Sequence, residues 1–347
     1  MNPDRQYLTL RRPDDWHLHL RDGAMLETVL PFTVERFCRA MVMPNLEVPV
    51  TSPDLAEDYR RRIIAAVPGG AQFTPLMTCY LTDDTRPEVM VEAYRNGIFA
   101  AAKLYPANVT TGAQAGVTDM ACIAKLLEAM EEADMPLLVH GEVADPDVDP
   151  FDREAVFIDR VLAPLRRSHP GLRVVFEHVT TEDAVAFVAE SNGRTAATIT
   201  PHHLVINRGA MFAGGFRPHF YCLPVAKRER HRKALRQAAT SGEGSFFLGT
   251  DSAPHPDRAK FSASGCAGIF NAPVALEVYA QVFEEEGALD RLEDFASVFG
   301  PRFYGIKANQ DTVTLERAPW QVPAQVAAAD GDVLTPFMAG GTVNWRL

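Results

Sequence analysis

The sequence predicts an α/β fold, a (β/α)8 TIM barrel with a short C-terminal extension. Short apolar stretches alternate with segments whose apolar residues recur at helical spacing, and this strand–helix unit occurs eight times along the 347 residues. Parallel strands need crossover connections, which helices supply while they cover the sheet. A barrel of this kind commonly spans about 250 residues or more as one unit, so the chain length is compatible with it.

The first expected strand covers residues 14–20 and carries two histidines. Residues two apart in a strand point to the same face, so His17 and His19 can direct both imidazoles to one point while Leu18 faces packing. This spacing is typical of metal ligands. The same spacing also occurs on the polar side of exposed strands. The metal-ligand interpretation of the pair therefore depends on other residues of the chain.

The other elements follow from apolar runs and their end signals. After the second strand, Ser52 can cap a helix, Pro53 takes its first position and Pro68 ends it. The same reasoning places the remaining strands at residues 39–43, 73–80, 98–104, 137–140, 173–178, 196–200 and 245–251, and helices at residues 53–66, 87–96, 119–133, 151–167, 181–190, 227–239 and 272–286.

The chain organisation favours a single domain over residues 1–347. There is no clear linker and no low-complexity tract, and the tail from about residue 311 has the pattern of short extended segments packed on the barrel. A doubly wound open sheet is the alternative fold. It is disfavoured because no strand is followed by a G-x-G-x-x-G turn.

Charge and composition limit the possible partners. The formal net charge of -11 argues against general nucleic-acid binding, which needs clustered Lys and Arg. A basic run at residues 227–233 is interrupted by Glu229 and continues into a helical pattern, which indicates a solvated helix face. Ordinary apolar and charged fractions, 47% and 23%, are those of a globular protein with a large core.

The cysteines and the apolar runs predict a cytoplasmic protein with no membrane partner. The five cysteines are odd in number and form no C-x-x-C pair, which favours reduced thiols over a disulfide framework. The first residues lack a signal-peptide core, and no apolar run is long enough to cross a bilayer. Cys222 and Cys266 flank the expected site in sequence without a base beside them, which predicts structural roles.

Polar residues gather at the strand ends, where a barrel places its active site. A single strand-end histidine is more often a hydrogen-bonded core residue than a ligand. Seven polar residues at one end of the barrel are harder to explain in that way. They are His17, His19, Asn45, Lys103, His140, His178 and Asp251.

The chemistry of this group predicts a metal centre. Imidazole nitrogens and a carboxylate suit Zn²⁺ or a similar divalent ion, and four histidines with one aspartate are too many for one tetrahedral catalytic ion. Two ions about 3.5–4 Å apart would share a hydroxide and polarise a carbonyl. A bridging anion is then needed. Lys103 can supply it if its amine adds carbon dioxide to become a carbamate.

These motifs resemble the amidohydrolase superfamily and, within it, the dihydroorotases of the short bacterial type. The resemblance covers nearly the whole chain and thins towards the C-terminus. It is carried by residues 13–23, 42–46, 103–108, 140–142, 176–178 and 248–255, and is extended by residues 217–219, 221–224 and 265–268.

The resemblance implies the reversible cyclisation of N-carbamoyl-L-aspartate to L-dihydroorotate, a step of pyrimidine synthesis, in a homodimer. It implies two Zn²⁺ ions per subunit, bridged by an N6-carboxylated Lys103. His17, His19 and Asp251 would hold the first ion and His140 and His178 the second. Asp251 would also be the general acid and base.

The family's substrate contacts map onto Arg21, Asn45 and His255, which would bind the α-carboxylate, with backbone groups near Leu223 and Ala267 at the pyrimidine edge. A carboxylate calls for a guanidinium and neutral donors, so this mapping makes chemical sense. The plainer alternative for Arg21 is a surface ion pair with Asp22 or Glu27. Without the family, Asn45 and His255 would equally suit capping or turn roles.

The segment from residue 106 to 116 is small, polar and without periodicity, which indicates a mobile loop. In the family a loop at this place closes over substrate and offers hydroxyls, which map onto Thr110 and Thr111. A plain surface connection is the alternative.

Two other functions compete with the dihydroorotase reading. A hydantoinase-like cyclic-amide hydrolase would use the same metal scaffold, but its substrates lack the carboxylate that Arg21, Asn45 and His255 suit. A metal-free barrel kept as an assembly partner would be expected to have lost ligands, yet every expected ligand position is occupied.

Overall fold

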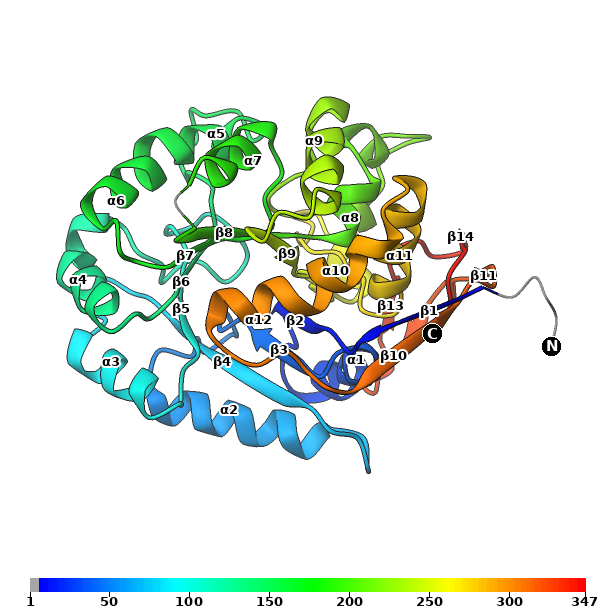
Figure 1. Cartoon of the computed structure of the whole chain (residues 1–347), viewed down its shortest axis with the longest axis horizontal. Helices are drawn as coiled ribbons and strands as arrows, with labels where there is room; N and C mark the ends of the chain where they lie inside the picture. Colours follow the sequence, from blue (N-terminus) through cyan, green and yellow to red (C-terminus); the bar gives the residue numbers. More distant parts are fainter. Residues whose placement is uncertain (1–5, 192) are drawn as a thin grey trace.

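Eight parallel strands follow one another in chain order around the centre of the computed structural model, which describes residues 6–191 and 193–347 (Figure 1). The sheet closes where residues after the last strand meet the first: Leu18 bridges Ser252, and the His19 amide donates to the Ser252 carbonyl at 2.9 Å. The predicted barrel is confirmed. Its strands are β2 (Asp14–Leu18), β3 (Arg39–Val42), β4 (Thr74–Tyr80), β5 (Ala101–Leu104), β6 (Leu137–Val139), β7 (Val174–Phe176), β8 (Thr195–Ile199) and β9 (Phe246–Leu248).

Helices surround the barrel, and most lie where the sequence places them (Figure 1). Three predicted helices are shorter or divided: the helix at 227–239 begins at Glu229, and those at 119–133 and 151–167 contain 3₁₀ or π turns. The main helices after the first strand pair are α2 (Pro53–Ala66), α3 (Pro87–Arg95), α4 (Ala124–Glu132), α5 (Arg153–Phe157), α6 (Ala163–Ser168), α7 (Glu182–Ala189), α8 (Pro201–Val205), α9 (Glu229–Thr240), α10 (Asp257–Lys260), α11 (Ala275–Glu285) and α12 (Phe299–Tyr304).

Four helices of the described structure lie outside the predicted ranges: the short α8, α10 and α12, and the long α1 (Gly23–Arg36), which connects β2 to β3. Gly23 at its start and Pro31 inside it are residues associated with breaks, so the segment lacks the usual helix signals. Asp22 begins the helix by accepting a hydrogen bond from the Gly23 amide at 3.0 Å. Buried residues such as Leu26 and Leu30 then fix the helix against the barrel.

The barrel interior is built in two layers because side chains alternate along each strand. The lower layer is apolar and takes about one residue from each strand. Trp16 is its largest member, fully buried and stacked on Tyr304 with ring centroids 4.3 Å apart. The layer contains Trp16, Met41, Ala101, Leu138, Val175, Ala196 and Phe247. The second layer lies two residues further along the strands, and it carries polar side chains.

The N- and C-terminal segments pack together beside the barrel. β1 (Tyr7–Arg11) pairs antiparallel with β10 (Thr312–Glu316), at the right of Figure 1. Short strands at the end of the chain pair with one another: β11 (Trp320–Gln321) with β14 (Thr342–Val343), and β12 (Val326–Ala327) with β13 (Val333–Leu334). The expected extended C-terminal segments are therefore present.

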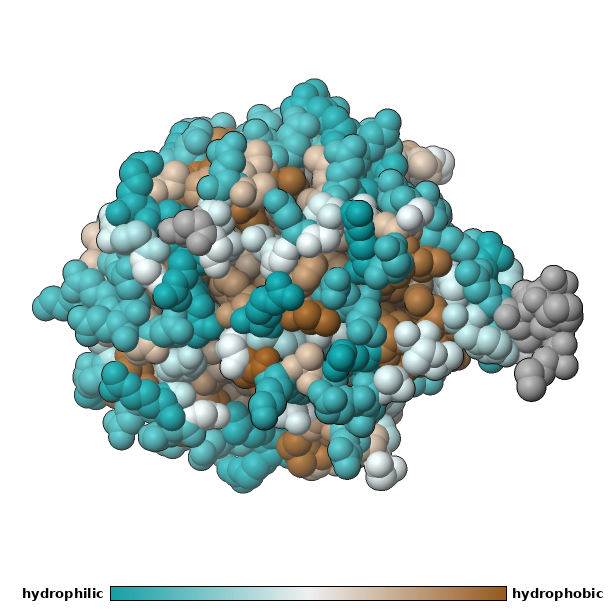
Figure 2. Space-filling view, viewed as in Figure 1, coloured by the Kyte–Doolittle hydropathy of each residue, from teal (hydrophilic) through white to brown (hydrophobic). Residues whose placement is uncertain are grey.

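The molecular surface shown in Figure 2 is mostly hydrophilic and is interrupted by smaller apolar patches. Among the residues that the structure describes, no helix combines the length and the apolar character needed to cross a membrane.

A buried ion pair links the first and last helices of the barrel ring. Arg36 at the end of α1 makes two hydrogen bonds to the Glu277 carboxylate in α11, at 2.9 and 2.6 Å, and a third to the Pro273 carbonyl at 2.7 Å. Both side chains are almost fully buried. Arg36 Nη1 also donates to Glu35 at 2.7 Å, but that carboxylate is exposed, so removing Glu277 would leave the buried guanidinium without its buried counter-charge.

We expect Glu277→Ala to destabilise the protein by about 3–5 kcal/mol, because Arg36 would stay buried without its partner. The double variant Arg36→Met/Glu277→Leu is the control, and it should lose much less stability because no charge remains. Urea unfolding followed by circular dichroism measures both. A Glu277→Ala variant within about 1 kcal/mol of the parent would show that water or another group compensates Arg36.

Candidate metal centre and substrate pocket

The polar layer of the barrel interior follows directly from strand alternation. Lys103, His140 and Glu177 each lie two residues after an inward apolar residue of β5, β6 and β7. All three are at least 98% buried. The sequence reasoning identified Lys103 and His140 but gave Glu177 no role, although the same alternation from Val175 predicts that Glu177 points inward.

The four predicted histidines form a continuous row at the barrel mouth. Ring centroids are 5.4 Å apart between His19 and His17, 4.8 Å between His17 and His178, and 4.9 Å between His178 and His140. Asp251 closes one end of the row: its Oδ1 lies 3.2 Å from His19 Nε2 and 3.6 Å from His17 Nε2. One ligand atom from each of these three residues lies within 4.8 Å of the others, so together they could hold a cation.

Two buried glutamates select the histidine tautomers. Glu177 Oε2 lies 2.8 Å from His17 Nδ1 and also accepts the Thr198 hydroxyl at 2.6 Å. Glu142 Oε2 lies 2.9 Å from His140 Nε2. Because an imidazole that donates from one nitrogen keeps a lone pair on the other, His17 Nε2 and His140 Nδ1 are the nitrogens free to bind a metal.

Burial keeps three of the histidines neutral, which is the form that binds metal. It lowers the pKa of His17, His19 and His178 well below the usual value, and the charge of Lys103 adds to the effect on each. The Nδ1 atoms of His19 and His178 are buried without a hydrogen-bond partner in the described part of the chain. No described hydrogen bond at Nδ1 therefore fixes the tautomer of these two rings.

Lys103 has the properties of an amine that can react. Burial lowers its pKa to about 8, although the carboxylates of Glu177 and Asp251 oppose the shift. Its Nζ atom is fully buried and has no hydrogen-bond partner among the described residues. A lysine with this pKa has a substantial neutral fraction, and only the neutral amine can add carbon dioxide.

Three site residues have left-handed backbone conformations, which residues with a Cβ rarely adopt. The φ angles are 59° at Arg21, 41° at His178 and 45° at Asp251. At Asp251, burial also raises the carboxyl pKa to about 7, opposed by Lys103, His140 and Arg21. Backbone strain of this kind clusters at functional sites.

Arg21 lies between the metal-ligand row and an outer cleft. Its Nη2 is 3.0 Å from His255 Nε2, and its Nε donates to the Pro254 carbonyl at 3.2 Å. The alternative ion pair with Asp22 is not formed among the described residues, because Asp22 pairs with Arg62. The structure therefore brings Arg21 and His255 together beside the histidines.

The loop at 106–116 lies over the site and is held there by two hydrogen bonds. Asn45 Nδ2 donates to the Thr111 carbonyl at 3.1 Å, and the Tyr80 hydroxyl donates to the Gly112 carbonyl at 3.0 Å. The enclosed cavity has a volume of only about 30 Å³. It is lined by His17, His19, Arg21, Asn45, Tyr105, Thr110, Thr111, His140, His178, Leu223, Asp251, Ala253, Ala267 and Gly268, so every predicted ligand and substrate residue except Lys103 and His255 reaches it.

An open cleft of about 730 Å³ adjoins this cavity on the outer side of the loop. Arg21, Asn45 and Thr111 line both spaces, and His255 lines the cleft. The inner cavity is much smaller than ordinary ligand pockets.

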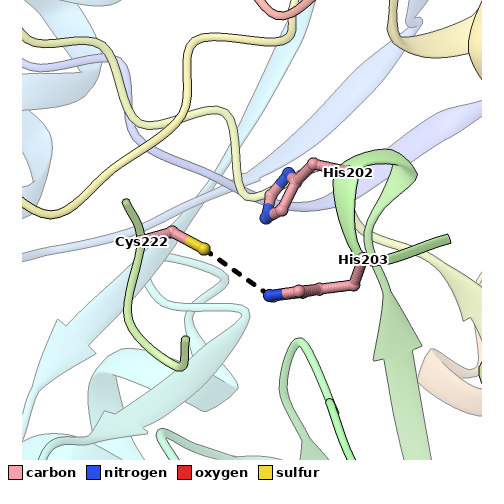
Figure 3. Close-up of side chains that lie close together, drawn as sticks. All are labelled: His202, His203 and Cys222. Carbon is pink, nitrogen blue, oxygen red and sulfur yellow. Dashed lines mark hydrogen bonds between the residues drawn. The ribbon is translucent and has the colours of Figure 1, made fainter. Parts of the chain in front are cut away.

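The sequence-based statement that Cys222 has no base beside it is wrong. Cys222 Sγ lies 3.5 Å from His203 Nε2, and His202 lies next to both residues (Figure 3). Sequence spacing gave no sign of this, since the loop after α8 brings Cys222 back to the helix. Burial raises the pKa of the Cys222 thiol to about 12, which disfavours a reactive thiolate, and the structural role stays a prediction.

This second cluster is a poor metal site despite its residue types. Asn271 Nδ2 lies 2.7 Å from the Thr250 carbonyl and 3.0 Å from His202 Nδ1. The amide nitrogen must donate to the carbonyl, so His202 Nδ1 accepts and the imidazole proton is on Nε2, the buried nitrogen without a partner in the described structure. A protonated nitrogen cannot bind a cation.

Known proteins share this architecture over its full length. The amidohydrolase family model matches residues 15–340. A dihydroorotase from Synechococcus sp. (strain RCC307) is 63% identical over 347 residues, covering 100% of this chain and 99% of the relative. The crystal structure of Saccharomyces cerevisiae dihydroorotase in complex with 5-fluoroorotic acid superposes with a TM-score of 0.91 at 35% identity, covering 98% of each chain. Dihydroorotase from Campylobacter jejuni gives 0.90 at 34% identity, covering 100% of this chain and 99% of that one. The chain therefore belongs to the amidohydrolase family and, within it, to the dihydroorotases.

Proposed function

We propose that this chain catalyses the reversible cyclisation of N-carbamoyl-L-aspartate to L-dihydroorotate in pyrimidine synthesis, at a centre that binds two Zn²⁺ ions. The observation that carries the proposal is the row of four buried histidines that ends at Asp251. The full-length similarity to dihydroorotases supports the same reaction. We extend the proposal to a cytoplasmic location, on the cysteine content and the pattern of apolar runs, and to a homodimer, on the family resemblance alone.

The residues present fit two zinc ions. His17, His19 and Asp251 would hold the first, His140 and His178 the second, and Lys103, as a carbamate, would bridge them. The fit rests on ligand atoms: Glu177 and Glu142 leave His17 Nε2 and His140 Nδ1 free, and His19 Nε2 lies beside Asp251. Lys103 Nζ is buried without a partner within the described chain. Bound zinc would lower the pKa of a shared water and polarise the ring amide carbonyl.

Asp251 is the residue that we propose moves the proton. In the hydrolytic direction it accepts the proton of the attacking water and delivers it to the leaving ring nitrogen, and ring closure reverses these steps. Its carboxyl is held beside His17 and His19, so it touches the place where the water would lie. The raised pKa of about 7 describes the carboxyl without a cation beside it.

Specificity for a carboxylate substrate rests on Arg21, Asn45 and His255. The Arg21 guanidinium is held by His255 and the Pro254 carbonyl, so it is already oriented at the mouth. Leu223 and Ala267 also line the cavity, and we place the pyrimidine edge against their backbone groups. Hydantoin-type substrates lack the carboxylate that this arrangement suits, which disfavours the hydantoinase alternative.

The loop at 106–116 is proposed to act as a lid. Thr110 and Thr111 line the inner cavity, so their hydroxyls would face bound substrate when the loop is closed. Release of the Asn45 and Tyr80 hydrogen bonds would open it towards the outer cleft. Asn45 would then exchange its hydrogen bond to the Thr111 carbonyl for one to the substrate carboxylate.

Metal-replete protein supplied with bicarbonate is expected to hydrolyse dihydroorotate and to cyclise N-carbamoyl-L-aspartate, as measured by the absorbance of the dihydropyrimidine ring. Dihydrouracil is the matched control because it lacks only the carboxylate, and its kcat/KM should be lower by at least about 100-fold. Failure of both dihydroorotate reactions would refute the proposed function. Faster turnover of dihydrouracil would favour the hydantoinase alternative.

Arg21→Ala should raise the KM for dihydroorotate about 10- to 100-fold with a smaller change in kcat, because a charge-assisted contact to the substrate carboxylate is lost. Arg62→Ala is the matched control, since Arg62 lines only the outer cleft and pairs with Asp22. Steady-state kinetics on the two variants make the comparison. A lowered kcat with unchanged KM in Arg21→Ala would contradict the carboxylate role.

A further inference from the structure

One buried carboxylate next to the metal-ligand row has no role in the proposed reaction. Asp15 lies on β2, two residues before His17, and is 1% exposed. Its Oδ1 accepts the amides of His17 at 3.2 Å and Thr250 at 2.8 Å, and its Oδ2 accepts the Thr250 hydroxyl at 2.6 Å. One side chain therefore ties the strand that carries two histidines to the residue before Asp251.

Further hydrogen bonds hold the residues on both sides of Asp251. The Thr250 hydroxyl also accepts the Ser252 amide at 3.1 Å, and the Thr250 carbonyl accepts Asn271 Nδ2 at 2.7 Å. The Ser252 hydroxyl accepts the Asn271 and Ala272 amides at 3.3 and 3.1 Å. The residues before and after Asp251 are thus fixed through both backbone and side chain.

Asp251 itself needs this support because its φ of 45° lies in the left-handed region. Its own amide donates to the His17 carbonyl at 2.7 Å, and the His19 amide donates to the Ser252 carbonyl at 2.9 Å. The direction of the Asp251 carboxyl therefore depends on the turn formed by residues 250–252. That turn is attached to β2 through Asp15.

We infer that Asp15 and Thr250 form a positioning pair that sets the Asp251 carboxyl relative to His17 and His19. This inference rests on the proposed function, because it assigns the pair to the residue that moves the proton. Neither side chain lines the inner cavity, so both are positioning residues and neither contacts substrate. The competing account is that the pair only stabilises the closure between β2 and β9.

The Thr250 hydroxyl is the decisive group because it both donates to Asp15 and accepts from Ser252. Thr250→Val keeps the shape of the side chain but leaves Asp15 Oδ2 and the Ser252 amide without that partner. Thr250→Ser keeps the hydroxyl. The two substitutions therefore separate the hydrogen bonds from the packing.

A matched control lies on another strand. The Thr78 hydroxyl is equally buried and donates to the Val42 carbonyl at 2.6 Å, between neighbouring strands β3 and β4. Thr78→Val removes a comparable hydrogen bond between strands of the same barrel. It leaves the turn at residues 250–252 intact.

The test compares kcat, KM, bound zinc and the visible spectrum of the Co²⁺-substituted enzyme in Thr250→Val, Thr250→Ser and Thr78→Val. We expect Thr250→Val to bind two ions, to keep KM within about 3-fold and to lose about 10- to 100-fold in kcat, because small displacements of a reacting group have effects of this size. The visible absorption bands of Co²⁺-substituted Thr250→Val should shift relative to those of the parent enzyme. Thr250→Ser should restore both properties, and Thr78→Val should keep both even if its stability falls.

A folded Thr250→Val enzyme with parental kcat and Co²⁺ spectrum would overturn the inference and leave a structural role. If Thr250→Val does not fold, Asp15→Asn carries the same comparison, with a reduced kcat and shifted bands expected and parental values contradicting the pair. An inactive parent enzyme would refute the proposed function instead. The Co²⁺ spectra would still decide whether Asp15 and Thr250 position Asp251.

Discussion

Closure of the parallel barrel between β2 and the segment after β9 is the constraint on which the site depends. It places His17 and His19 beside Asp251, more than two hundred residues away in the chain, through the hydrogen bonds His19 to Ser252 and Asp251 to His17. Lys103, His140 and His178 come from strands between these two. The barrel thus brings residues from distant parts of the chain to one mouth, where no local segment could form the site.

Desolvation gives the collected groups their common chemical character. It favours the uncharged form of an ionisable group, so it lowers the pKa of His17, His19, His178 and Lys103. It raises the pKa of Asp251 and Glu177, the last to about 8. Neutral imidazoles are ligands, a neutral amine can become a carbamate, and cations bound there would restore the carboxylates. Burial therefore favours neutral ligand groups at the barrel mouth, and cation binding there would favour the ionised carboxylates.

The strand–helix alternation and the strand-end histidines could be predicted from the sequence because both are periodic features. Helix α1 could not be predicted, since Pro31 in its interior is a residue that usually ends or kinks a helix. Glu177 lies on an inward position that alternation from Val175 predicts, but His178 also turns into the site with a positive φ that alternation does not predict. Contacts such as Glu142 with His140, or Cys222 with His203, depend on loop paths that spacing does not encode.

The proposed pair of zinc ions bridged by a carboxylated Lys103 can be observed by anomalous diffraction at the zinc absorption edge, on crystals grown with zinc and bicarbonate. We expect two anomalous peaks about 3.5–4 Å apart, with density for a carboxyl group on Lys103 Nζ between them. A single peak, or two peaks beside an unmodified Lys103, would refute the bridged pair.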